Sequence, residues 1–310
     1  VDHVRITVYY TESFSISGTV YTDEGVTNIG SLKTVAVSIN GAAAAGTDDT
    51  DASGAYSITG LTFSAGDVLT LYLDGETEKA VTVTVTAGSN MTNIHLFQNY
   101  LITRHDNSGS LTNANLDTAN NNADTDITDI YTGTATITTA SGKSLYIPAS
   151  HTFAPANPVS VGGSWTDVGT FTPGTSTVTF TSTATGKTIT STGSSFYSLT
   201  FNGSGGGWTL QDATTVSNVL TITAGTLKGG SATLTLSGTT GNPFNESSGT
   251  FTAGTGTVAY TGNAAEGNTT VAFVTYYNLT VNNASETFAL EWDTTVSNTL
   301  TLTAGTLDAS

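Results

Sequence analysis

This chain of 310 residues is defined first by what it contains little of. It has no Cys and one Met, so neither disulfide bonds nor thiol chemistry is available to it. Seven Lys plus Arg stand against 24 Asp plus Glu, and a net charge of −17 argues against nucleic acid and anionic membrane surfaces as partners. No run approaches the ~18 apolar residues that span a bilayer as a helix. We therefore expect no membrane insertion in this segment.

The residues that are abundant favour β-structure. Thr, Val, Tyr and Phe suit a pleated, half-buried surface, while 34 Gly and many Asn supply turns. No stretch of ten or more residues carries an apolar stripe at helical spacing. The sequence therefore predicts an all-β protein.

The first twelve residues predict a strand without a partner in its own neighbourhood. In "VDHVRITVYY" one face carries the apolar side chains and the other carries Arg5 and Thr7. Such a strand needs a sheet to join. It either ends a preceding domain or is donated to a neighbouring subunit, and the candidate subunit-contact residues are Val4, Ile6, Val8 and Tyr10.

Residues 13–98 show short apolar segments separated by turns. Ser17–Val20 forms the first such segment, and Thr50–Tyr56 ("TDASGAY") forms a turn in which Asp51 can bond its own backbone. These two stretches resemble carboxypeptidase-regulatory-like and Cna-B-like modules of surface proteins. The resemblance implies a β-sandwich with a non-enzymatic spacer role.

Residues 99–130 are rich in Asn and Asp and poor in apolar residues, which predicts a linker or a cap. Carboxylates at alternate positions of a polar loop are typical Ca²⁺ ligands. The Gly and distal Glu of an EF-hand loop are missing here, which leaves either a looser Ca²⁺ site or a solvated acidic loop. The candidate ligands are Asp117, Asp124, Asp126 and Asp129.

Residues 131–310 contain a tandem repeat with a period of 80. Residues 169–230 align with residues 249–310 without a gap and with 28 identities in 62 positions, so the unit 169–248 is followed by an incomplete unit, 249–310. "TTVSNVLTITAGTL" at 214–227 returns as "TTVSNTLTLTAGTL" at 294–307. Leu220 and Ile222 are predicted to point inward, and Gly225, like Gly305, is predicted to turn the chain.

Within each unit, apolar β segments recur about every 20 residues, which indicates a parallel β-solenoid with about four rungs per unit. "LTITAGTL", "LTLSG" and "GTFTAGTGTV" resemble the Thr/Gly-rich solenoid repeats of filamentous-haemagglutinin-like bacterial surface proteins. Because 80 residues also make one small sandwich, tandem immunoglobulin-like sandwiches are the alternative.

The repeats offer no recognisable catalytic constellation. Each of the four Glu residues in the repeats (Glu246, Glu266, Glu286 and Glu291) has a non-acidic residue 80 positions earlier, which weakens a glycosidase-type acid pair. The candidate sugar-stacking aromatics are Trp165, Trp208, Trp292, Tyr276 and Tyr277, with core packing as the alternative.

The sequence as a whole predicts an extracellular or cell-surface structural protein. It would act as a stalk, an adhesin shaft or a filament subunit, without enzymatic activity and with Ca²⁺ as the candidate cofactor. Its expected partners are copies of itself or neighbouring domains of the same surface protein, joined by β-strand contacts, with glycans as a further candidate. The alternative function is a carbohydrate-binding or polysaccharide-degrading solenoid.

Overall fold

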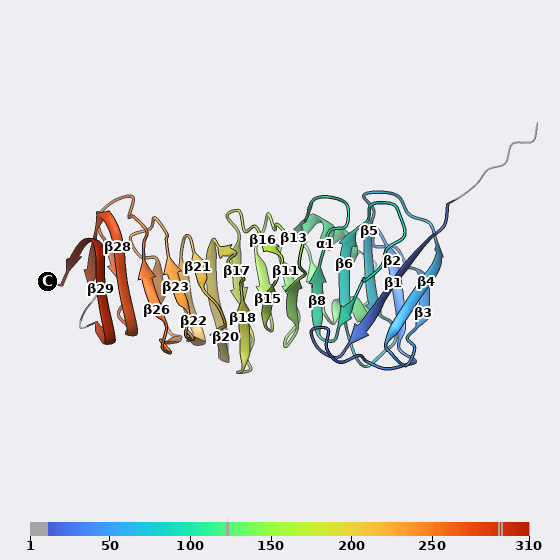
Figure 1. The fold of residues 1–310 in the computed structure, drawn as a ribbon, viewed down its shortest axis with the longest axis horizontal. Coiled ribbons are helices and arrows are strands. Elements are labelled where there is room, and N and C mark those ends of the chain that lie inside the picture. Colours follow the sequence, from blue (N-terminus) through green and yellow to red (C-terminus); the bar gives the residue numbers. More distant parts are fainter. Residues whose placement is uncertain (1–11, 122–123, 291, 293, 310) are drawn as a thin grey trace, which may run out of the picture.

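A computed structural model describes residues 12–121, 124–290, 292 and 294–309. It is 51% strand and 4% helix, which confirms the all-β prediction. Figure 1 shows an elongated molecule whose strands stack along the long axis, with β1 (Phe14–Tyr21) near one end and β29 (Thr295–Asp308) at the other. The predicted subunit-contact strand, with Val4, Ile6, Val8 and Tyr10, lies outside the described residues.

The first part of the chain forms two sheets around one core. The strands are β1 (Phe14–Tyr21), β2 (Thr34–Ile39), β3 (Ala44–Asp49), β4 (Ala55–Leu61), β5 (Val68–Leu73), β6 (Val81–Val85) and β7 (Leu96–Phe97). One sheet has the order β4-β1-β7, and in the other β3, β2, β5 and β6 pair antiparallel. Ile16, Tyr56 and Leu71 meet in the core between them. The named sandwich module stays a prediction.

The turn before β4 forms as its residues predict. Asp51 Oδ1 accepts hydrogen bonds from the backbone N–H of Ser53 (2.7 Å) and Ala55 (3.0 Å), and Tyr56 then enters the buried strand. The carboxylate therefore replaces water as the acceptor for two turn amides.

Strands β5 and β6 are buried on both faces, which explains their unbroken apolar character. Leu69 and Leu71 point into the first core, whereas Tyr72 and Val83 point into a second core. Two helices, α1 (Asn113–Asn120) and α2 (Thr125–Thr128), contribute to that second core. The helix α1 starts at a capping box in which Thr112 and Asn115 bond each other's backbone N–H groups.

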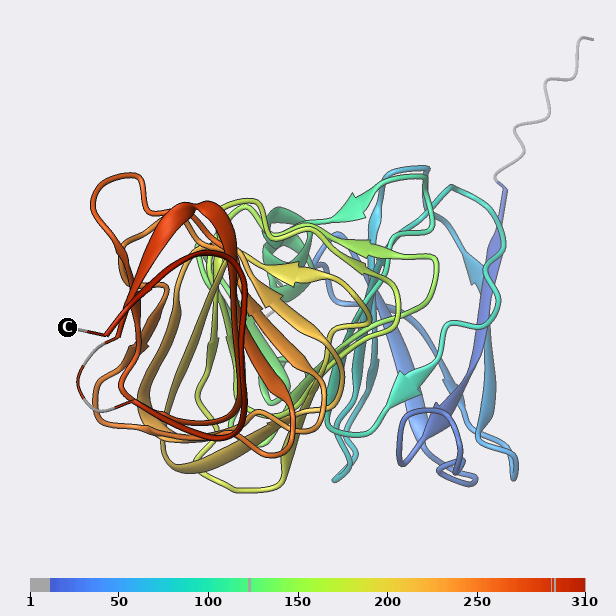
Figure 2. The same ribbon diagram turned by 60° about the vertical axis from the view of Figure 1, so that its left-hand side comes forward.

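A parallel β-solenoid of about 11 coils occupies residues 81–308. Its first strand, β6, pairs antiparallel with β5 and parallel with β8 (Tyr100–Thr103), so one sheet continues across the predicted domain bounds near 98 and 130. Figure 2 shows the coils as successive loops around a common interior. Apart from the antiparallel pair β10 (Tyr131–Gly133) and β11 (Ile137–Thr139), the described strands of this region pair in parallel with one another, which confirms the solenoid and rules out tandem immunoglobulin-like sandwiches there.

The remaining strands follow one another around the coils. The earlier ones are β8 (Tyr100–Thr103), β9 (Ser110–Leu111), β10 (Tyr131–Gly133), β11 (Ile137–Thr139), β12 (Ser144–Ile147), β13 (Thr152–Phe153), β14 (Val159–Val161), β15 (Trp165–Asp167), β16 (Thr170–Phe171), β17 (Thr177–Phe180), β18 (Lys187–Thr190) and β19 (Ser195–Phe196). The later ones are β20 (Ser198–Leu210), β21 (Thr214–Val216), β22 (Leu220–Lys228), β23 (Thr233–Leu236), β24 (Phe244–Glu246), β25 (Thr250–Thr252), β26 (Thr257–Tyr260), β27 (Thr269–Val271), β28 (Thr275–Leu290) and β29 (Thr295–Asp308).

The interior is a set of ladders in which each inward side chain stacks on its partner in the next coil. One ladder runs Val159, Val178, Leu199, Leu220 and Phe244, all at most 1% exposed. Each such side chain contributes about 1.5–3 kcal/mol by leaving water. The spacing of about 20 residues seen in the sequence is the length of chain between two partners of one ladder.

The 80-residue repeat is not a whole number of coils. Leu199 belongs to the ladder just described, but Leu279, its counterpart 80 positions later, belongs to a different ladder with Leu234, Val258 and Leu300. The two ladders occupy different faces, because Leu220 of the first and Leu234 of the second lie on consecutive strands β22 and β23 of the same coil. Each repeat is therefore turned by one face relative to the one before.

The matching segments 214–227 and 294–307 have the same turn conformation but differ in the burial of one leucine. Gly225 (φ +83°) and Gly305 (φ +97°) take the left-handed conformation predicted for the turn. Leu220 is fully buried between β20 and β24, whereas its counterpart Leu300, in the last described strand, is 50% exposed. The same side chain thus has two coils around it in one copy and one coil in the other.

We expect Leu220→Ala to lower the free energy of unfolding by about 2–5 kcal/mol, because it empties a site between two coils. Leu300→Ala, the same substitution in the second copy, is expected to cost no more than about half as much, since half of the side chain is already in water. Urea denaturation followed by circular dichroism measures both. Equal losses for the two variants would contradict the ladder assignment.

Candidate functional site

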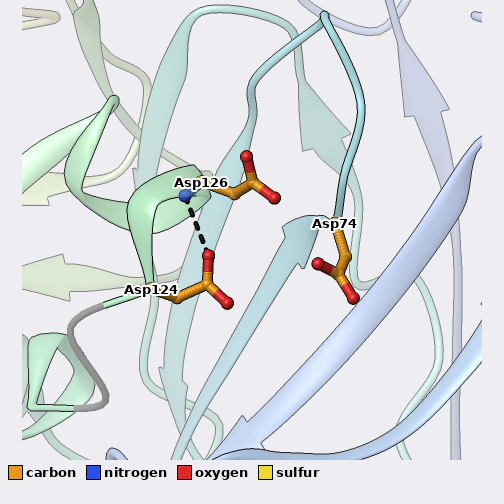
Figure 3. Close-up of side chains that lie close together, drawn as sticks. All are labelled: Asp74, Asp124 and Asp126. Carbon is orange, nitrogen blue, oxygen red and sulfur yellow. Dashed lines mark hydrogen bonds between the residues drawn. The ribbon is translucent and has the colours of Figure 1, made fainter.

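Two of the four predicted Ca²⁺ ligands come together in the fold, joined by a third acid from elsewhere. Asp124 is the N-cap of α2 and accepts a hydrogen bond from the Asp126 N–H at 2.9 Å. Asp74, which directly follows β5, faces them, and carboxylate oxygens of the three residues lie within 4.8 Å of one another (Figure 3). The cluster therefore sits where α2 covers the end of β5.

Neighbouring protein groups already donate hydrogen bonds to carboxylate oxygens of this cluster. The Lys79 ammonium donates to Asp126 Oδ1, and the Gly75 N–H donates to Asp126 Oδ2 at 2.6 Å. The Tyr72 hydroxyl donates to Asp124 Oδ2 at 3.3 Å. Burial, followed by the charges of Asp124 and Asp126, raises the pKa of Asp74 above its ordinary value. The arrangement favours one cation, and the Lys79 ammonium supplies one.

The cluster is a modest donor set for calcium. Ca²⁺ takes about six to eight oxygen ligands, and of the three carboxylates here one is bonded to Lys79. Asp117 on α1 and Asp129 after α2 are exposed and are not members of the cluster. Calcium binding therefore stays a prediction. Asp74 was missed in the sequence because it lies in another part of the chain and no motif links it to α2.

The candidate sugar-stacking aromatics separate into two groups. Trp165, Trp208 and Tyr276 are fully buried in the solenoid core, and the Tyr276 hydroxyl donates to the backbone oxygen of Ala272 at 2.8 Å. Tyr277 is half-buried. Trp292, by contrast, is 81% exposed. Core packing accounts for the first three, and Trp292 is the most exposed aromatic of this set.

Glu286 has a structural role that the sequence comparison did not show. Its carboxylate is buried and accepts hydrogen bonds from the backbone N–H of Ala264 (3.1 Å) and Thr269 (2.7 Å) and from the Thr269 hydroxyl. Its counterpart is Gly206, where a Cβ would lie 2.0 Å from the Ser182 backbone oxygen. The second copy must therefore open a space that the first copy does not have.

A shift of two residues creates that space. Ile189 pairs with Leu210, whereas Val271, 82 positions later, pairs with Leu290, which is only 80 positions after Leu210. The loop between β26 and β27 is thus longer than its counterpart between β17 and β18, and Glu286 bonds the extra backbone amides. Around β18 and β27, residues that occupy equivalent positions in the two copies are therefore 82 positions apart in the sequence, and not 80.

The two other Glu residues of the repeats that the structure describes lie in separate segments. Glu246 Oε1 accepts a hydrogen bond from the Phe251 N–H at 2.6 Å, and Glu266 is exposed in the β26–β27 loop. Glu291 lies outside the described residues.

Comparison with protein-family models, with curated proteins and with solved structures finds no match to this chain. Among the described residues, neither helix has the length and apolar character needed to cross a membrane.

We expect Asp74→Asn to raise the free energy of unfolding at pH 7, by less than about 1 kcal/mol because water partly screens the site. Above its raised pKa, ionised Asp74 destabilises the folded state. As the pH falls through that pKa, the carboxyl takes up a proton and the gain from the substitution disappears. Urea denaturation at pH 7 and pH 4 measures the difference.

Asp117→Asn, which removes an exposed acid of the same predicted set, is the matched control and should change the stability little at either pH. A calcium site would reverse the result. With millimolar Ca²⁺ present, the wild type would then gain stability and Asp74→Asn would lose that gain.

Proposed function

We propose that this chain is an extracellular structural protein, a solenoid stalk or filament subunit that associates with further copies of itself through β-strand contacts. The observation that carries the proposal is the state of the last described coil. Among the described strands β29 pairs with β28 alone, so one edge of a 14-residue strand has no partner strand. An edge of this length is a template for β-augmentation.

The side chains of β29 support the same function. Leu300 and Leu302 are 50% and 52% exposed, while their counterparts Leu220 and Ile222 are fully buried under β24. Apolar side chains that point along the solenoid interior gain about 25 cal/mol per Å² when another coil covers them. A second copy that places a strand on β29 would bury both leucines and pair the free backbone edge.

The spacer role rests on the distribution of apolar and charged residues. The described core residues of the solenoid pack one coil against the next. The buried carboxylate of Glu286 bonds the backbone of a loop. The two modest likenesses noted in the sequence, to carboxypeptidase-regulatory-like modules and to haemagglutinin-like solenoids, favour the same extracellular, non-enzymatic role. A net charge of −17 is compatible with solubility outside the cell.

We expect Leu302→Lys to abolish self-association, because it places an ammonium group in the apolar face that the second copy must cover. Thr301→Lys adds the same charge to the adjacent position of β29, on the outward side, and should leave association within about threefold of wild type. Sedimentation velocity over a concentration series and negative-stain electron microscopy measure the outcome. A wild-type chain that stays monomeric throughout would contradict the proposal.

A second prediction concerns which strand fills the edge. If residues 1–10 are donated, deleting them should abolish association, and a synthetic peptide VDHVRITVYY should bind the truncated protein in place of the missing strand. Fibres of normal morphology from the truncated chain would exclude strand donation but not association through β29, because the Leu302→Lys result is independent of it.

A further inference from the structure

A cavity of about 270 Å³ lies on the flank of the solenoid near its last coils. Its lining includes two exposed aromatic side chains and three polar ones, namely Phe273, Trp292, Asn242, Asn245 and Glu246. A second hollow of about 170 Å³, which also has Phe273 in its wall, continues toward Thr275 and Thr295. The two hollows share Phe273 and are together called here the Trp292 groove.

The groove crosses three coils. Glu246 ends β24, Phe273 follows β27, and Trp292 follows β28. The Thr270 N–H donates to the Gly241 backbone oxygen at 2.7 Å, which holds the first two of these segments side by side. A ligand that lay along the groove would therefore contact successive coils, as an extended chain molecule can.

The aromatic residues replace a stabilising contact of the first copy. Asp212, 80 positions before Trp292, accepts hydrogen bonds from the backbone N–H groups of Ser191 (3.0 Å) and Thr192 (2.5 Å) and so closes the turn between β18 and β19. The corresponding turn, between β27 and β28, carries Phe273, which is 55% exposed. The second copy has Trp292 at the position of the capping Asp212, and both Trp292 and Phe273 are solvent-exposed.

Packing and backbone preference do not explain this exchange. Trp292 is 81% exposed and has φ +58°, a conformation that is unfavourable for a residue with a side chain. The Thr294 N–H donates to the Trp292 backbone oxygen at 2.8 Å and fixes the turn. An exposed ring held in an unfavourable conformation beside a cavity points to a ligand.

The chemistry of the lining selects the class of ligand. Indole and phenyl faces are apolar and flat, while the Asn242 and Asn245 amides both donate and accept and Glu246 accepts hydrogen bonds. Glu246 is positioned by its bond to the Phe251 N–H at 2.6 Å. A pyranose ring offers an apolar C–H face and a rim of hydroxyl groups. A purely apolar ligand would leave the Asn242 and Asn245 amides without a partner from the ligand, and an anion would meet Glu246 and the acidic chain.

We propose that the Trp292 groove binds a neutral oligosaccharide, with sugar rings stacked on Trp292 and Phe273 and hydroxyl groups bonded to Asn242, Asn245 and Glu246. The groove reaches β29 at its first residue, Thr295, but Leu300 and Leu302 do not line it, and it adds a recognition function to the structural one.

The test uses the whole chain and a panel of neutral hexasaccharides of glucose, xylose, mannose and galactose, with an oligogalacturonate as the anionic probe. Because Trp165 and Trp208 are fully buried, acrylamide quenching of the intrinsic fluorescence reports mainly on Trp292. At least one neutral sugar is expected to protect the fluorescence, with the anionic probe much weaker. Calorimetry then gives the affinity.

Trp292→Ala and Asn245→Ala should each weaken that affinity, the first by about tenfold or more. Val168→Ala, which truncates an exposed apolar residue elsewhere on the solenoid, should leave it unchanged. Circular dichroism verifies that the variants are folded. Binding of no neutral sugar at millimolar concentration, or equal affinity in Trp292→Ala, would overturn the proposal. The Leu302→Lys association assay is unaffected by either result, so the two functions fail or stand separately.

Discussion

The stacking of inward apolar side chains from coil to coil is the interaction on which the rest of this structure depends. Val178, Leu199 and Leu220 each lie between two neighbours of the same ladder, and the parallel backbone hydrogen bonds follow from their alignment. No single coil could bury its interior alone. Each coil is therefore stabilised by its contacts with the coils on either side. The described coil that contains β29 has one such neighbour, and its inward side chains Leu300 and Leu302 are exposed.

Patterns that depend on local chemistry were predictable from the sequence. The alternation of Leu220 and Ile222 with Thr gave the inward face, and Gly225 gave the corner, because side-chain direction and positive φ are set within a few residues. The helix α1 was not predicted, since its mean apolar content is low and Leu116 and Ala119 gain their burial only from the sheet beneath them. Tertiary contact decided that element.

The candidate sites were less predictable for the same physical reason. Asp124 and Asp126 were recognised as a local pair, but Asp74 and Lys79 reach them through the folding of β5 and β6 against α2. The sequence did not distinguish Trp165, Trp208 and Trp292 from one another. In the structure the first two lie in the core and Trp292 is exposed. Glu286 aligns with Gly206, so the repeat alone gave it no role. In the structure its carboxylate accepts backbone hydrogen bonds at the longer β26–β27 loop.

The rotation of the repeat by one face has a consequence for the appearance of a longer molecule. If further 80-residue units followed the same path, each would present its outward side chains one face further around the coil than the unit before it. Identical surface features would then wind around the shaft as a screw thread. A rod built in this way would show the same decoration to every side, whichever way it faced its surroundings.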